Sequence, residues 1–147
     1  MLPYYKQETD FYCGPAVVQM LFAGRGVMMT QTQLAEALGT AAGAGTSLEA
    51  IVHILSLHGF ETKHKNGASL ADIAEALGAG KSALVGYTET ENQEPHYALV
   101  AELGKEEVVL IDPHHGERYA LPINTFEEQW RDNERHMYGE RALVTVA

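Results

Sequence analysis

The chain contains a single cysteine, Cys13, and its neighbours give the thiol a setting in which it can react. Gly14 and Pro15 follow it and are typical of a helix start, with Gly14 at the N-cap and Pro15 at the first helical position. An apolar stripe at helical spacing continues the pattern: Val17, Val18, Leu21 and Phe22. A thiol ahead of such a helix lies at the positive end of its dipole, which lowers a cysteine pKa from about 8.5. The pattern therefore predicts either a nucleophile at Cys13 or, as for many lone cysteines, a buried small hydrophobe.

A histidine and an aspartate at the two ends of a predicted hairpin form the second candidate pair. Strands are predicted over 96–103 and 107–112, with a turn at Gly104. In an antiparallel hairpin the start of the first strand lies beside the end of the second, so His96 and Asp112 become neighbours. If Asp112 lies opposite His96 or Ala98, both side chains project from the same face of the sheet. A carboxylate there would hold the imidazole tautomer and leave the other ring nitrogen to exchange a proton with a thiol.

A metal site is a weaker interpretation of the same region. His114 and His115 follow Asp112 closely, and all three are possible metal ligands. Consecutive side chains in extended backbone diverge, however, and no His-x-x-x-His spacing supports them. We therefore expect neither a metal nor an organic cofactor.

The elements that would position these residues fall into two groups. Helices are predicted over 31–38, from a Thr46–Glu49 capping box to His58, from Ser69 to Gly78, and over 125–131. Strands are predicted over 60–64, 82–87, 96–103, 107–112, 118–121 and 140–146. Helices first and strands second indicate an α+β fold, with N-terminal helices packed on a mostly antiparallel sheet. We expect one domain over residues 1–147.

The charge and hydropathy of the chain exclude several classes of partner. Twenty acidic residues against ten Lys and Arg give a formal net charge of −10, which repels phosphate backbones and anionic lipid surfaces. The N-terminal residues lack the basic and then apolar pattern of a signal peptide, and the apolar runs are too short to cross a bilayer. We therefore expect a cytoplasmic protein that binds no nucleic acid and has no membrane segment.

Several short motifs occur together in this chain in a fixed order. Gln7 lies six positions before Cys13-Gly-Pro-Ala, followed by Gly45-Thr-Ser-Leu-Glu-Ala, a helix ending in His-Gly-Phe60, then His96-Tyr-Ala-Leu-Val and Ile-Asp112-Pro113. This series resembles the double-glycine leader peptidases. These are papain-like cysteine peptidases found on bacteriocin-exporting transporters and in related stand-alone proteins. The likeness covers nearly the whole chain.

The resemblance implies a papain-like fold and a role for each of four residues. Cys13 would be the nucleophile, His96 the general base and acid, and Asp112 the group that orients His96. Gln7 would donate to the oxyanion together with the Cys13 backbone N–H. The implied partner is a peptide or protein substrate cut after a pair of small residues such as Gly-Gly. Tyr12 occupies a position where transporter-linked members typically have Asp, and we expect no transporter to be attached to this chain.

Two other functions use the same residues differently. A papain-like acyltransferase would pass the acyl group from Cys13 to an amine or thiol, as phytochelatin synthases do, and their Cys-Gly segment is also similar to Cys13-Gly14. An idle peptide-binding domain would need no thiol. Retention of all four candidate residues argues against that last alternative, so a thiol-dependent peptidase is the function we expect.

Overall fold

The elements follow one another with helices first and strands second. The computed structural model describes residues 2–147, and Met1 lies outside it. The helices are α1 (Cys13–Ala23), α2 (Gln31–Leu38), α3 (Leu48–Leu57), α4 (Leu70–Gly78) and α5 (Ile123–Gln129). The strands are β1 (Thr62–Lys65), β2 (Ser82–Thr88), β3 (Pro95–Leu103), β4 (Glu107–Asp112), β5 (Gly116–Pro122) and β6 (Leu143–Val146).

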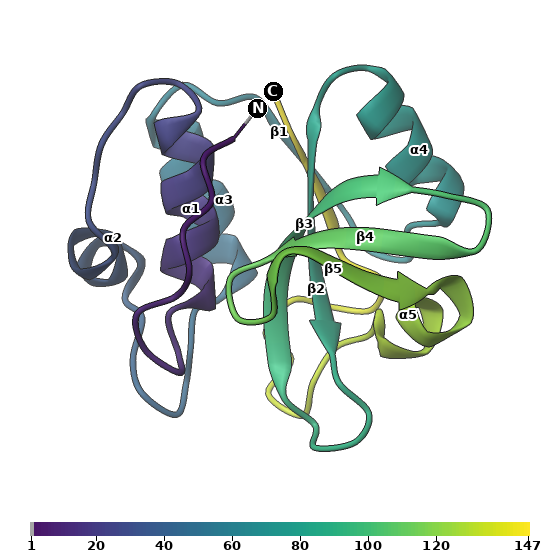
Figure 1. The fold of residues 1–147 in the computed structure, drawn as a ribbon. Coiled ribbons are helices and arrows are strands. Elements are labelled where there is room, and N and C mark those ends of the chain that lie inside the picture. The colour runs from purple at the N-terminus through teal and green to yellow at the C-terminus, as the bar shows by residue number, and fades with distance from the viewer. Residues whose placement is uncertain (1) are drawn as a thin grey trace.

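All six strands form one sheet, in the order β1-β6-β2-β3-β4-β5. Every neighbouring pair is antiparallel, so the predicted α+β class is confirmed. The last strand, β6, lies between β1 and β2 and brings the C-terminus close to the N-terminal end of the chain (Figure 1). Among residues 2–147, every helix is too short or too polar to cross a bilayer.

Helices cover both faces of the sheet (Figure 1). On β3, Tyr97 and Leu99 pack into the core beneath α1, α2 and α3, whereas Ala98 and Val100 pack into the core beneath α4 and α5. This alternation follows from the two-residue period of a strand. It places His96 on the α4 and α5 face, at the end of β3 nearest the start of α1.

Two of the predicted helix starts are confirmed and two are wrong. Thr30 and Ser69 each form a capping box, at the starts of α2 and α4. At α3 the cap is Ser47, whose hydroxyl accepts from the Ala50 N–H at 3.2 Å, and not Thr46. Thr46 is instead buried, and its hydroxyl shares a 2.7 Å hydrogen bond with Thr40. Because a buried hydroxyl needs a hydrogen-bond partner, the Thr46 hydroxyl bonds to Thr40, and the exposed Ser47 caps the helix.

The start of α1 also differs from the prediction. Tyr12 occupies the N-cap position without a side-chain cap, and Cys13 is the first helical residue. Gly14 is needed for close packing rather than for capping, because a Cβ there would lie 2.6 Å from the Thr46 hydroxyl oxygen. This close approach holds the first turn of α1, and with it Cys13, against the loop that precedes α3.

Candidate active site

Cys13 lies at the N-terminus of α1 and is half-buried. Burial raises the pKa of the Cys13 thiol to about 11; backbone hydrogen bonds at Tyr97 and Gly14 lower it, and the negative charge of Asp112 raises it further. The lowered pKa expected from the helix start is therefore wrong. Removing the sulfur from water disfavours the thiolate by more than the helix N–H groups favour it.

Three of the four predicted site residues line one small pocket of about 30 Å³: Gln7, Cys13 and His96. The remaining walls are Asp10, Glu94, Pro95 and His114. The pocket brings together the N-terminal segment, the start of α1 and the start of β3. A thiol, an imidazole and a side-chain amide thus share a space about the size of one or two water molecules.

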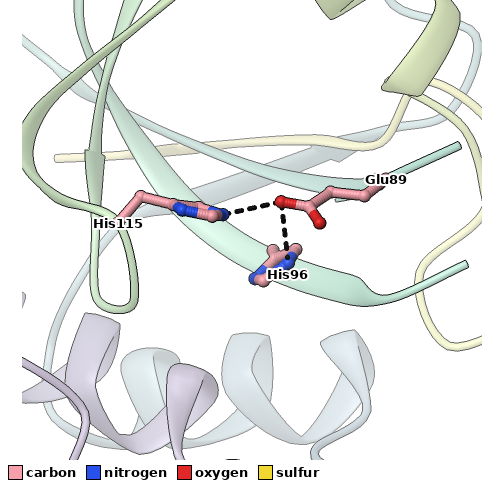
Figure 2. Close-up of side chains that lie close together, drawn as sticks. All are labelled: Glu89, His96 and His115. Carbon is pink, nitrogen blue, oxygen red and sulfur yellow. Dashed lines mark hydrogen bonds and ion pairs between the residues drawn. The ribbon is translucent and has the colours of Figure 1, made fainter. Parts of the chain in front are cut away.

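His96 is almost completely buried, with 5% of its surface exposed. Burial lowers the pKa of the His96 imidazole, while the carboxylates of Asp112 and Glu89 oppose that shift. Its Nε2 lies 3.4 Å from Glu89 Oε1, and it has no hydrogen-bond partner among residues 2–147 (Figure 2). A neutral imidazole beside a neutral thiol is therefore the resting state of this site.

Asp112 is fully buried at the end of β4. The register pairs Leu99 with Ile111, which meets the condition stated from the sequence, so Asp112 and His96 project from the same face of the sheet. No ion pair joins the two residues within the described chain. The carboxylate instead accepts from the Tyr87 hydroxyl and, at 2.8 and 2.9 Å, from the backbone N–H groups of His114 and His115.

Tyr87 connects Asp112 with the imidazole. Its ring stacks on His96 with a centroid separation of 5.2 Å, while its hydroxyl donates to Asp112. Burial and the neighbouring Asp112 carboxylate raise the Tyr87 pKa well above its ordinary value, so the hydroxyl keeps its proton and remains a donor. Asp112 therefore acts on His96 through its charge and through a packed tyrosine.

Gln7 lies in the segment that crosses from the N-terminus to α1. Its backbone N–H donates to the Pro113 carbonyl at 2.9 Å, and its Nε2 donates to the Thr9 carbonyl at 2.8 Å. Its Oε1 is buried and finds no partner in the described part of the chain. The side-chain amide thus has a second N–H free to donate, because Nε2 carries two hydrogens.

Gln31, the first residue of α2, holds this segment from both sides. Its Nε2 donates to the Lys6 carbonyl at 2.9 Å, and its Oε1 accepts from the Glu8 N–H at 2.9 Å. Gln31 is only 1% exposed. These bonds flank Gln7 on the chain and position it. Gln31 was missed from the sequence, where it was only the first residue of a helix.

The sequence model of the Peptidase C39 family matches residues 1–134. The chain belongs to the Peptidase C39 family. Solved structures of C39 proteins resemble it over nearly their whole length, although sequence identity is low. No curated protein matches the chain.

Three solved structures illustrate the likeness. The peptidase domain of Streptococcus ComA, a bifunctional ABC transporter involved in quorum sensing, is 17% identical, with a TM-score of 0.74 and coverage of 100% of this chain and 98% of that one. A double-glycine motif protease from an AMS/PCAT transporter, in complex with the leader peptide, is 14% identical, with a TM-score of 0.72 and coverage of 99% and 91%. A protein from Bacillus anthracis assigned as a C39-like peptidase is 16% identical, with a TM-score of 0.73 and coverage of 99% and 94%. The predicted papain-like fold is confirmed.

In this C39 family member, two further residues lie beside His96: Glu89 was missed from the sequence, whereas His115 was considered there only as a possible metal ligand. Glu89 follows β2, and His115 lies in the turn between β4 and β5. The His115 Nε2 lies 2.6 Å from Glu89 Oε1. A signal for Glu89 existed, because pairing strand 82–87 with strand 96–103 brings the residues after the first strand beside His96. The place of His115 beside Glu89 could not be predicted, since the shape of its turn depends on Asp112.

The raised pKa of Cys13 predicts a slow thiol in this C39 family member. With a pKa of about 11 the thiolate fraction at pH 7.5 is about 0.03%, against about 10% for a free thiol of pKa 8.5. Alkylation by iodoacetamide should therefore rise through pH 9 and 10 without levelling off. Mass spectrometry of the modified protein against pH gives the profile. A plateau below pH 7 would show that the helix N-terminus lowers the Cys13 pKa by more than burial raises it.

Proposed function

We propose that this protein is a papain-like thiol peptidase that cleaves peptides through an acyl-enzyme on Cys13. The observation that supports the proposal is the single small pocket shared by Cys13, His96 and Gln7. A nucleophile, a base and an oxyanion donor are the three groups that acyl transfer requires. Membership of the Peptidase C39 family agrees with this chemistry.

The first step begins from a neutral pair. As Sγ of Cys13 attacks the carbonyl carbon of the scissile bond, His96 accepts the thiol proton, so no free thiolate is needed beforehand. The carbonyl oxygen becomes an oxyanion. It accepts hydrogen bonds from the free N–H of Gln7 Nε2 and from the Cys13 backbone N–H, the role proposed for an oxyanion hole.

The second step returns the proton. The His96 imidazolium protonates the leaving amine as the C–N bond breaks, leaving a thioester on Cys13. Water then loses a proton to His96 and attacks the thioester, which releases the carboxylic acid and restores the thiol. The buried Asp112 carboxylate stabilises the imidazolium by its charge, and Tyr87 fixes the plane of the ring.

The size of the pocket supports a substrate with small residues at the cleavage point. About 30 Å³ beside Cys13 leaves no room for a branched or aromatic side chain. A wider groove of about 420 Å³ adjoins it, with Phe11, Met137 and the small residues Ala42 and Gly43 among its walls. We propose that the groove holds the residues that precede the small pair at the cleavage point. The similar double-glycine motif protease from an AMS/PCAT transporter was solved in complex with the leader peptide, which agrees with a peptide ligand here.

A peptide panel tests the proposal directly. Peptides that differ only in the two residues before the cleavage point, Gly-Gly, Gly-Ala, Ala-Ala or Val-Val, are incubated with the protein and analysed by mass spectrometry. We expect cleavage of the Gly-Gly peptide and at least about a hundredfold slower cleavage of the Val-Val peptide, since a steric mismatch in a tight pocket costs a few kcal/mol.

The same experiment separates the alternatives. Adding a small amine and a small thiol to the panel makes a transferred product visible, and its predominance over the hydrolysed product would indicate an acyltransferase. Unchanged peptide that nevertheless binds in calorimetry would indicate a binding domain. Equal cleavage of all four peptides would contradict the proposed selection of small residues.

A further inference from the structure

Three side chains with metal-binding atoms converge next to the C-terminal end of β2. Glu89, His96 and His115 point toward one another from the end of β2, from β3 and from the turn before β5 (Figure 2). Their nearest ligand atoms all lie within 4.8 Å of one another. Glu89 Oε1 is 3.4 Å from His96 Nε2 and 2.6 Å from His115 Nε2.

The nitrogen of His96 that faces this cluster has nothing to bind. Nε2 is buried, and among residues 2–147 it makes no hydrogen bond, although His96 is only 5% exposed. Unpartnered buried polar atoms are rare because each one costs the free energy of its lost hydration. The Glu89 oxygen at 3.4 Å lacks hydrogen-bond geometry, so a ligand that accepts a lone pair would fit better than the carboxylate does.

We propose that Glu89, His96 and His115 form an inhibitory site for a divalent transition metal ion of the zinc class. A tetrahedral ion with bonds of about 2.0–2.1 Å holds its ligand atoms about 3.3–3.4 Å apart. The His96–Glu89 separation already has that value, and the His115–Glu89 separation needs to open by less than an ångström. The site differs from the one considered in the sequence, because Asp112 and His114 are not ligands.

The donor set and the charge of the region select the ion. Two imidazoles and one carboxylate suit Zn²⁺, Co²⁺ or Ni²⁺, whereas Mg²⁺ and Ca²⁺ prefer oxygen alone. Glu94 Oε2 lies 4.0 Å from His96 Nε2 and is half exposed, so it or water can complete the coordination. Binding requires His115 Nε2 to give up its proton, which moves to Nδ1 or to solvent.

The ion would switch off the proposed base. A neutral imidazole bound to a metal through Nε2 carries its one proton on Nδ1, so neither nitrogen accepts the Cys13 proton. This consequence, unlike the metal site itself, rests on the proposed function. Free zinc should therefore inhibit peptide cleavage, and removal of the zinc by a chelator should restore cleavage.

Calorimetry with zinc chloride tests the site without any activity assay. The titrated protein is the tag-free Cys13→Ala variant, which has no thiol to bind the metal. We expect one ion per chain. Glu89→Gln, which keeps the side-chain size, and His115→Ala should each weaken binding at least about tenfold in the same background, because even an outer-shell partner is worth about 10–100-fold. Loss of the tetrahedral visible absorption of bound Co²⁺ should accompany both changes.

His64→Ala is the matched control. His64 is an exposed histidine on β1 whose side chain contacts Asn66, and its removal should leave the zinc affinity unchanged. Zinc affinity equal in all variants, or absent from Cys13→Ala while present in the wild type, would overturn the metal site. Binding at the site without loss of peptide cleavage would overturn the inhibitory role. A failure of cleavage in metal-free wild type would count against the proposed function alone.

Discussion

Cys13→Ala is expected to lower the rate of peptide cleavage by about 10⁴-fold or more, which corresponds to about 5.5 kcal/mol of lost transition-state stabilisation. Without the sulfur no thioester forms, and the remaining groups only polarise the carbonyl for attack by water. The Gly-Gly peptide that the wild type cleaves is the substrate, and initial rates with purified protein are the measurement.

Two controls make the result specific to the thiol. Thermal unfolding should show that Cys13→Ala remains folded, since the change removes one atom from the first turn of α1. The variant should also still bind the Gly-Gly peptide in calorimetry, because every other wall of the groove, Pro95 and Met137 included, keeps its side chain. Cleavage within tenfold of the wild type would end the proposal of an acyl-enzyme on Cys13.

His96→Ala should produce a loss of cleavage similar to that of Cys13→Ala. The thiol has a pKa of about 11, so the site depends on a base at the moment of attack more than a site with a preformed thiolate does. A residual rate should remain, because a small fraction of Cys13 ionises without help, and that rate should rise with pH. The Cys13→Ala, His96→Ala double variant should be no worse than Cys13→Ala, since without the thiol the base has no proton to accept.

Imidazole and pH separate a base from a packing residue. Free imidazole in the buffer should partly restore cleavage in His96→Ala, because the lost ring leaves a cavity of its own shape beside the pocket. A surface histidine variant such as His64→Ala should show neither the loss nor the rescue.

In the wild type, burial lowers the pKa of His96, so the base stays neutral and cleavage persists as the pH falls below 6.5. In His96→Ala this persistence of cleavage at low pH should disappear, because the base that causes it is gone. If free imidazole does not restore cleavage in His96→Ala, and the dependence of cleavage on low pH is the same as in the wild type, His96 has a structural role.

The sequence predicted most of the fold because its elements carry local signals. The helix starts predicted at Thr30 and Ser69 depend on residues close together in the chain, and the structure confirms them. The prediction of Thr46 as a helix cap was wrong because its buried hydroxyl is hydrogen-bonded to Thr40. The prediction of Gly14 as an N-cap was wrong for a related reason, since Gly14 instead lets α1 approach Thr46 closely.

The candidate site divides in the same way. Residue type and order were enough to select Gln7, Cys13, His96 and Asp112 and to place the chain near the double-glycine leader peptidases. The hairpin that makes His96 and Asp112 neighbours was also predictable, but the register that puts them on one face came from the structure.

The tertiary structure alone decided the electrostatics and the partners. Whether Cys13 is a thiolate depends on how much water reaches the sulfur, and that depends on segments far apart in the chain. Asp112 is occupied by Tyr87 and by the turn after β4, so Glu89 is the carboxylate nearest to the His96 Nε2. The chemistry-bearing residue types could be read from the sequence because each is a local choice, but their protonation and their neighbours are set by burial and long-range contact, which only the folded chain provides.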